Sequence, residues 1–425
     1  MVENWNIDNR IAPMLTGEDL NNELEVLPSY DKGIRTRTPA ERLMALNDIY
    51  SFYKPSHMSH EIYTKIYLAM VRSFQKKGSK IAMKQRNQNA NAIKSNGSSF
   101  GGVIGGCDCF SIIGSPGIGK SRSIERAVSL AGGENVIDLE KPYCKIIPII
   151  NVQCPFDCSA KAMLLSICKK IDEAIGSSYY EMEVRARAST NVMIVSVAQV
   201  LLNHCAVLVI DEIQNLVKHR AGVQLVAMLT ELLNESGISI IMVGTPEVES
   251  FFSGVDYLAR RTIGLRYDKC AYDDYWYEFC YELWKYQYVT NQSELSDSIL
   301  HYLYEHSAGT ISHVLFLFHT AQEISILNGR ECLDMAALEE AYQRMRMLHT
   351  HIEPDISLKK KPCKRKKKEA AIEVNASHTT LEEIPVEKCE TENWSFEEYA
   401  RISKKKNVDM ALLLKGKISI TELVV

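Results

Sequence analysis

Residues 114–121 form a glycine-rich segment of a type that binds phosphate, preceded by an apolar run and followed by a helix expected from about Arg122. They match G-x-x-x-x-G-K-[ST], in which backbone N–H groups and the N-terminus of the helix surround phosphate oxygens. Lys120 would hold the β- and γ-phosphates, and the Ser121 hydroxyl would bind Mg²⁺. We therefore predict a site for ATP and Mg²⁺. Its residues are Gly114, Ser115, Pro116, Gly117, Ile118, Gly119, Lys120, Ser121 and Arg122.

Two adjacent carboxylates, Asp211 and Glu212, follow an apolar run at residues 206–210. Such a run is typical of a buried strand, and ligands of open α/β sheets bind at the carboxyl ends of the strands. We expect Asp211 to complete the nucleotide and metal site, and Glu212 to orient or deprotonate the attacking water. The pair therefore predicts Mg²⁺-dependent ATP hydrolysis. The alternative is an acid pair that caps a helix.

Three further residues are candidates for the same chemistry. Thr245 follows the apolar run at residues 239–243 and could sense the γ-phosphate from a strand tip, or could simply cap a turn. Arg260 and Arg261 lie in a short helix-to-strand stretch. Either arginine could reach the nucleotide of a neighbouring subunit and stabilise transition-state charge, or could be an ordinary surface residue.

The elements that must position these side chains follow from the apolar pattern. Apolar runs of strand length alternate with amphipathic segments of helix length, which predicts an α/β fold with a parallel five-stranded sheet covered on both faces. After Arg266 the pattern is helical only, which predicts a small all-helical lid. The predicted strands are residues 109–113, 146–152, 206–210, 239–243 and 262–265.

The same patterns divide the chain into five regions. Thr38, Pro39 and Glu41 have the types and spacing of a helix start. Two helices are expected from there to about Lys77, followed by an Asn/Ser/Gly-rich loop at residues 85–102. The regions are a flexible acidic arm (1–37), a basic helical extension (38–100), the α/β core (101–268), the helical lid (269–353), and a basic linker with a flexible, partner-binding C-terminal tail (354–425).

Charge is distributed unevenly along the 425 residues, although the formal net charge is only −4. Residues 31–100 hold 13 basic and four acidic residues, and eight of the ten residues 359–368 are basic. Basic runs suit a polyanion such as nucleic acid, and the alternative is a solvated face or linker. With 46% hydrophobic and 24% charged residues, no secretory signal and no membrane-length apolar run, we expect a soluble cytoplasmic protein with reduced cysteines.

The order of motifs resembles that of AAA+ P-loop ATPases, and more narrowly the TnsC/TniB-type transposition regulators. The phosphate loop and the Asp-Glu strand are shared by all AAA+ proteins. The more specific markers are Gln153-Cys154-Pro155-Phe156-Asp157 and Trp284-Lys285-Tyr286-Gln287. One departure is that the stretch at residues 307–313, where many AAA+ lids carry an arginine, has none, so Ser312 or His313 would have to substitute.

The resemblance implies an ATP-dependent ring or filament of identical subunits on double-stranded DNA, bound through its backbone without sequence preference. It implies partners in transposase subunits and in a target-selection protein of the TnsD/TniQ type, and a bacterial, nucleoid-associated location. By the same resemblance, Lys161 would contact the DNA backbone, and Lys169 and Lys170 could extend that track. Each of these lysines could equally be an ordinary solvent-facing residue.

Two other functions remain open at this stage. One is a signalling or scaffold NTPase switch that acts through protein–protein association and does not bind DNA. The other is a replication initiator or clamp-loader-like ATPase, which would be expected to have a DNA-binding domain after the lid.

Overall fold

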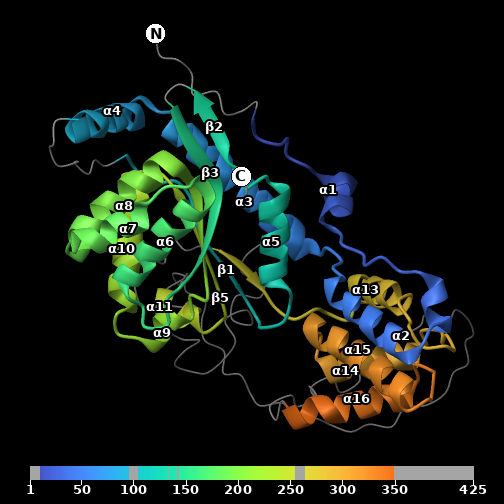
Figure 1. Cartoon of the computed structure of the whole chain (residues 1–425). Coiled ribbons are helices and arrows are strands. Elements are labelled where there is room, and N and C mark those ends of the chain that lie inside the picture. Colours follow the sequence, from blue (N-terminus) through green and yellow to red (C-terminus); the bar gives the residue numbers. More distant parts are fainter. Residues whose placement is uncertain (1–9, 95–103, 134, 141–142, 254–263, 349–425) are drawn as a thin grey trace, which may run out of the picture. The chain divides into compact units, whose positions relative to one another are not determined.

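The computed structural model describes residues 10–94, 104–133, 135–140, 143–253 and 264–348. The chain divides into two units, residues 1–359 and 360–425, and all the described residues belong to the first (Figure 1). The predicted basic linker and tail, 354–425, lie outside the described residues. None of the helices in these ranges combines the length and apolar character needed to cross a membrane.

The centre of the unit is a six-stranded sheet in the order β2-β3-β4-β5-β1-β6. Its strands β3, β4, β5, β1 and β6 are parallel, while β2 pairs antiparallel with β3 at the edge. Four of the five predicted strands are confirmed, whereas the strand predicted at residues 262–265 lies later, at 265–267, and residues 262 and 263 lie outside the described residues. The sequence pattern missed β2 because it is short and is defined by pairing with its neighbour. The strands are β1 (Cys109–Gly114), β2 (Ile137–Glu140), β3 (Tyr143–Gln153), β4 (Cys205–Asp211), β5 (Ser239–Gly244) and β6 (Leu265–Tyr267).

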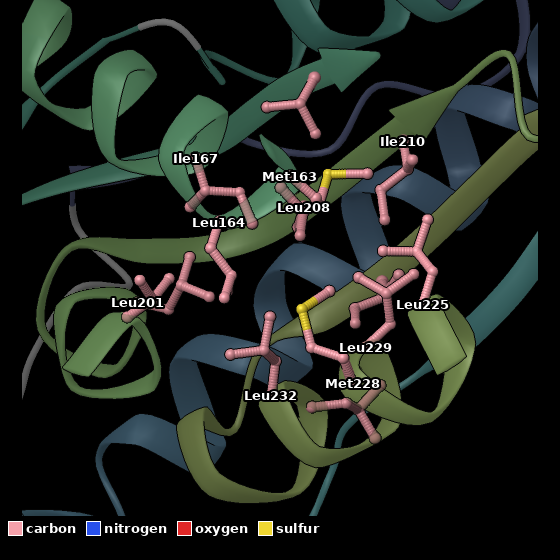
Figure 2. Packing of buried hydrophobic residues seen from close by; sticks show 14 of the residues in the cluster. Met163, Leu164, Ile167, Leu201, Leu208, Ile210, Leu225, Met228, Leu229 and Leu232 are labelled. Carbon is pink, nitrogen blue, oxygen red and sulfur yellow. The ribbon is translucent and has the colours of Figure 1, made fainter. Parts of the chain in front are cut away.

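Helices cover the sheet on both faces because its central strands are apolar on both. In β4, Leu208 and Ile210 belong to one apolar cluster, and Val207 and Val209 belong to the cluster on the opposite face. The first cluster is closed by α6 (Ala160–Ile175), α8 (Thr190–His204) and α10 (Gly222–Ser236), as Figures 1 and 2 show. The second is closed by α3 (His57–Lys77) and α5 (Lys120–Leu130). Shorter helices are α7 (Tyr179–Ala186), α9 (Asn215–Lys218) and α11 (Val248–Ser253).

The N-terminal region is more structured than the sequence indicated. The prediction of a flexible arm at residues 1–37 is wrong for residues 10–37, where Leu20 and Leu24 of α1 (Gly17–Leu24) are buried against α3 and α5. The predicted loop at residues 85–102 is also wrong up to Lys94, because α4 (Lys80–Lys94) continues through this polar stretch. The remaining elements here are η2 (Lys32–Thr36), α2 (Pro39–Leu46) and η3 (Asn47–Ser51).

The region predicted as one basic extension contributes to two different cores. Thr38 caps α2 through a capping box with Glu41, as the sequence predicted. Leu46 and Ile49, in α2 and η3, are buried in the lid cluster, whereas α3 packs on the sheet. The extension is therefore not a separate layer, because its first half completes the lid and its second half covers the sheet.

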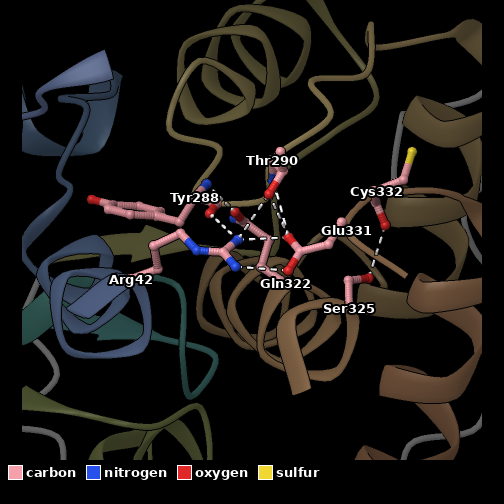
Figure 3. Close-up of polar contacts among 7 residues, drawn as sticks. All are labelled: Arg42, Tyr288, Thr290, Gln322, Ser325, Glu331 and Cys332. Carbon is pink, nitrogen blue, oxygen red and sulfur yellow. Dashed lines mark hydrogen bonds and ion pairs between the residues drawn. The ribbon is translucent and has the colours of Figure 1, made fainter. Parts of the chain in front are cut away.

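The lid is all helical, as predicted, and has its own apolar core. It consists of α13 (Asp274–Trp284), α14 (Asp297–Ser307), α15 (Ile311–Leu327) and α16 (Met335–Leu348). The aromatic residues of α13 that recur at helical spacing are buried, among them Trp276 and Phe279. An ion pair joins the buried Arg42 of α2 to the partly exposed Glu331, with Arg42 Nη1 2.6 Å from Glu331 Oε2 (Figure 3).

Candidate nucleotide site

The glycine-rich segment forms a loop between β1 and α5 that tolerates few side chains. Gly117 and Gly119 have φ of 76° and 97°, a conformation that L-residues rarely adopt. A Cβ on Gly114 would lie 2.7 Å from the backbone oxygen of Tyr267 in β6. The strand–loop–helix arrangement predicted from the sequence is present, with α5 beginning at Lys120.

Lys120 lies within this loop, and its ammonium group contacts the loop's own backbone. Its Nζ donates to the carbonyl oxygens of Gly114 at 2.7 Å and Ser115 at 2.8 Å. Burial lowers the pKa of Lys120, and the carboxylates of Asp211 and Glu212 act in the opposite direction. The cation is therefore partly removed from water and lies near the acid pair, as a phosphate-binding lysine requires.

The acid pair lies at the carboxyl end of β4, next to the phosphate loop. Ser121 Oγ is 3.5 Å from Asp211 Oδ2, although 90 residues separate them in the sequence. A hydroxyl and a carboxylate are the oxygen donors that Mg²⁺ prefers, so these two side chains fit a shared cation site. The backbone oxygen of Asp211 accepts from Cys154 N at 2.8 Å, which ties the acid to the chain that leaves β3.

Glu212 has an unusual backbone conformation and an exposed side chain. Its φ is 60°, and its N–H donates to the carboxylate of the preceding Asp211 at 2.8 Å. Left-handed residues other than glycine cost free energy and are enriched at functional sites. Gln214 Nε2 donates to Glu212 Oε2, so the carboxylate already has a neighbour in the same loop.

Thr245 lies directly after β5, which pairs with both β1 and β4. Its Oγ1 is buried and has no hydrogen-bond partner within the described ranges. Asp211, Glu212 and Thr245 thus lie at the carboxyl ends of two adjacent strands, β4 and β5, as the sequence indicated. Arg260 and Arg261 lie outside the described residues, so their predicted role stays a prediction.

Residues 104–252 match the family described as AAA domain. The match spans the phosphate loop, the acid pair and the strand before Thr245. The fold is the AAA+ P-loop fold. This confirms the fold class predicted from the motifs, with the addition of the antiparallel edge strand β2.

The chain is also similar to several solved structures. The Aeropyrum pernix ORC2 protein in ADPNP–ADP complexes is 15% identical, with a TM-score of 0.37 and coverage of 61% of this chain and 66% of that one. Drosophila ORC bound to DNA is 13% identical, with a TM-score of 0.44 and coverage of 79% of this chain and 71% of that one. The Thermotoga maritima RuvB Holliday junction branch migration motor is 13% identical, with a TM-score of 0.34 and coverage of 63% of this chain and 68% of that one. The chain thus spans about two thirds of their lengths, and no curated protein matches it.

The lid reaches the phosphate loop of the AAA domain through the start of α15. Ser312 N donates to the Gly117 carbonyl oxygen at 3.1 Å, and a Cβ on Gly117 would lie 2.3 Å from Ser312 Oγ. His313 Nδ1 instead lies 3.3 Å from the carbonyl oxygen of Ser307. Of the two residues considered in place of a lid arginine, Ser312 is therefore the one that contacts the loop.

Arg122 is directed toward the N-terminal region. Its guanidinium donates to the carbonyl oxygens of Tyr50 at 2.9 Å and Ser51 at 2.7 Å, both in η3. The Tyr50 ring in turn stacks on His319 of the lid, with ring centroids 4.8 Å apart. The Arg122 side chain thus joins the phosphate-loop helix to η3, and the predicted contact of Arg122 with the nucleotide stays a prediction.

The three candidate DNA-contacting lysines lie on α6. Lys161 is in the first turn, and Lys169 and Lys170 are two turns further on, all with exposed side chains. Lys170 Nζ is 2.9 Å from Glu173 Oε2, so its charge is partly compensated. Lys161 and Lys169 remain as the stronger candidates.

Part of the N-terminal positive charge has a structural role that the sequence did not reveal. Arg72 pairs with Asp108 at 2.8 Å. Lys77 is buried and donates to backbone carbonyls, and Arg86 donates to Leu202 O at 3.0 Å. The basic run therefore presents less free charge than its sequence indicates.

Proposed function

We propose that this protein is an ATP-dependent regulator of transposition that assembles on duplex DNA, connects a target-selection protein to the transposase, and is reset by ATP hydrolysis. The observation that supports the ATPase part is the approach of Ser121 Oγ to Asp211 Oδ2, 3.5 Å, with Lys120 and Glu212 at the same strand edge. This arrangement supplies the parts needed to bind and cleave a triphosphate.

Each residue has a defined role in the proposed reaction. The backbone N–H groups of the glycine loop and the Lys120 ammonium bind the phosphates and offset their charge. Ser121 and Asp211 hold Mg²⁺, which supplies charge neutralisation when bound. Glu212 accepts a proton from the attacking water, and its exposed carboxylate is accessible for that purpose.

The DNA part of the proposal rests on the connection between α6 and Asp211, the proposed metal ligand. The segment from Cys154 to Ser159 joins β3 to α6, whose first turn carries the exposed Lys161. Cys154 N donates to Asp211 O, and Asn215 Nδ2 donates to Cys154 O at 3.1 Å. A phosphate bound at the start of α6 would therefore lie one short segment away from the acidic strand tip.

The transposition part rests on the resemblance of two motifs, which have different roles in the fold. The Gln-Cys-Pro-Phe-Asp segment packs beside the acid pair. In the Trp-x-Tyr-Gln segment, Gln287 is buried and donates to Trp284 O at 3.0 Å and Ser293 O at 2.7 Å. The second motif is therefore part of the lid core, and the first is the better candidate for a link to partners.

The proposal is tested by binding of unrelated duplexes in the presence of a non-hydrolysable ATP analogue. We expect binding that requires the analogue and weakens steeply with salt. Lys161→Ala should weaken it and reduce the salt dependence, whereas Lys65→Ala, an exposed lysine on α3 at the opposite face of the sheet, should not. Absence of binding at low salt would count against a DNA-binding regulator.

A second function, an NTPase switch that acts through protein association without DNA, is favoured by the structural use of Arg72, Lys77 and Arg86. Size-exclusion chromatography distinguishes the two. An ATP-dependent increase in mass that DNA does not change would support the switch.

A further inference from the structure

Gln214 lies in the loop that follows the acid pair, between β4 and α9. The loop is held in place by backbone bonds to the neighbouring strand, because Ile213 N donates to Val243 O of β5 at 3.0 Å. It then continues as a tight turn, in which Leu216 N donates to Ile213 O at 2.9 Å. Gln214 is therefore fixed between the tips of β4 and β5.

The nitrogen of the Gln214 side-chain amide has a hydrogen-bond partner, and its oxygen has none within the described residues. Its Nε2 donates to Glu212 Oε2, whereas its Oε1 is buried and has no hydrogen-bond partner within the described residues. The amide orientation follows from chemistry, since an ionised carboxylate only accepts hydrogen bonds and must face the NH₂ group. The carbonyl end is thus left as an acceptor inside the strand edge.

A second unpartnered polar atom belongs to the same strand edge. Thr245 Oγ1 is buried without a partner in the described part of the chain. Gln214 Oε1 would lie 3.0 Å from a Cβ placed on Gly244, the residue before Thr245. Buried hydroxyl groups and amide carbonyls are nearly always hydrogen-bonded, so two orphaned groups at one edge point to a functional arrangement.

We propose that Gln214 is a positioning residue that couples Thr245 to Glu212. Neither Thr245 Oγ1 nor Gln214 Oε1 has a partner in the described part of the chain; with a triphosphate bound, the Thr245 hydroxyl would donate either to Gln214 Oε1 or to a phosphate oxygen. The Gln214 amide would then shift the Glu212 carboxylate that it holds. The inference rests on the proposed ATPase function. It adds that Gln214 orients the Glu212 carboxylate toward the attacking water.

The backbone of Glu212 explains why such a residue is needed. With φ at 60°, the chain turns sharply after Asp211, and the Glu212 side chain is exposed. An exposed carboxylate has many accessible rotamers, so a base of this kind needs an external partner to fix its direction. Gln214 is the residue whose side chain supplies that contact.

The test compares Gln214→Met and Gln214→Glu with the wild-type full-length chain, measuring kcat, KM for ATP, and kcat as a function of pH. Gln214→Met removes both polar ends at similar length, and we expect kcat to fall about tenfold with KM within twofold. Gln214→Glu places a second carboxylate beside Glu212, so the acidic limb of the pH profile should move up by about one pH unit. Gln224→Glu, at an exposed glutamine on α10, is the matched control and should change neither.

The outcomes separate the inference from the proposed function. If the wild-type chain does not hydrolyse ATP, the proposed function fails. If it does, and both Gln214 variants keep kcat within twofold and an unshifted pH profile, the positioning role is refuted. Loss of ATP binding together with kcat in both variants would also overturn it, because Gln214 would then build the binding site itself.

Discussion

Replacing Lys77 should destabilise the fold strongly, because its ammonium group serves two helix ends. Lys77 Nζ donates to Leu201 O at 2.8 Å, Leu202 O at 2.9 Å and Ser236 O at 3.2 Å, and the side chain is fully buried. These carbonyls lie in the last turns of α8 and α10, where helices offer few backbone donors. Lys77→Met removes all three hydrogen bonds, although Cys205 N–H still reaches Leu201 O and Arg86 still reaches Leu202 O. We expect the free energy of unfolding to fall by about 2 kcal/mol, mainly because Ser236 O loses its partner.

The pH dependence of stability provides a sharper version of this test. Burial, with a smaller contribution from the nearby Arg86, lowers the pKa of Lys77 from 10.5 to about 7. Below pH 7 the lysine is protonated in both states. Between pH 7 and 10.5 the unfolded chain binds one more proton than the native chain, so stability rises with pH over this window. From pH 7.5 to 9.5 this group alone should add about 2 to 3 kcal/mol.

Urea unfolding at pH 7.5 and 9.5, followed by circular dichroism, measures both effects. Wild type should gain stability relative to Lys77→Met as pH rises. Lys80→Met, at an exposed lysine of α4, is the control and should follow wild type at both values. The reasoning is refuted if Lys77→Met lies within 1 kcal/mol of wild type, or if the two proteins change equally with pH.

Three further predictions concern the nucleotide site and the lid. Glu212→Gln should retain ATP and lose hydrolysis by about a hundredfold or more, and so trap the ATP-bound assembly, as measured by single-turnover kinetics. Gly117→Ala should abolish nucleotide binding in calorimetry, because φ is 76° and the new Cβ would collide with Ser312. Arg42→Met should destabilise the lid by about 2 kcal/mol in thermal unfolding, because Glu331 loses its bidentate partner. Hydrogen bonding to Arg42 lowers the pKa of Glu331 to about 2, so in wild type this contribution is lost only as pH falls from about 4.5 toward 2.

The phosphate loop and the acid pair could be predicted from the sequence because each is formed by a short run of consecutive residues. Gly114 to Ser121 lies between a strand and a helix, and Asp211 follows an apolar run, so strand order alone brings them together. Gln214 lies only two residues after Glu212. Its contact with Glu212 could not be foreseen, because it depends on the left-handed turn at Glu212.

The basic run in the N-terminal region shows why charge patterns are ambiguous. In the sequence, Lys77 and Arg86 indicate a surface for polyanions, but in the fold both serve the carboxyl ends of helices. The polar segment around Gln85 and Asn89 has a low apolar content and suggested a loop. It is helical because Gln85 and Asn89 are buried and hydrogen-bond each other, and Asn89 also reaches Gln199 of α8. Contacts between residues far apart in the chain cannot be predicted from local sequence patterns.

The burial of Leu46, Ile49 and Phe52 in the lid cluster has a practical consequence for dissecting this protein. A truncated protein that starts at α3 would retain the whole phosphate loop and the acid pair. It would, however, expose an apolar surface on α13 and α15. Insolubility of such a fragment would reflect a missing piece of the lid's interior and would carry no information about the ATPase. Deletions from the N-terminus should therefore end before residue 10, because Ile11, Leu20 and Leu24 also pack on the cluster under α3 and α5.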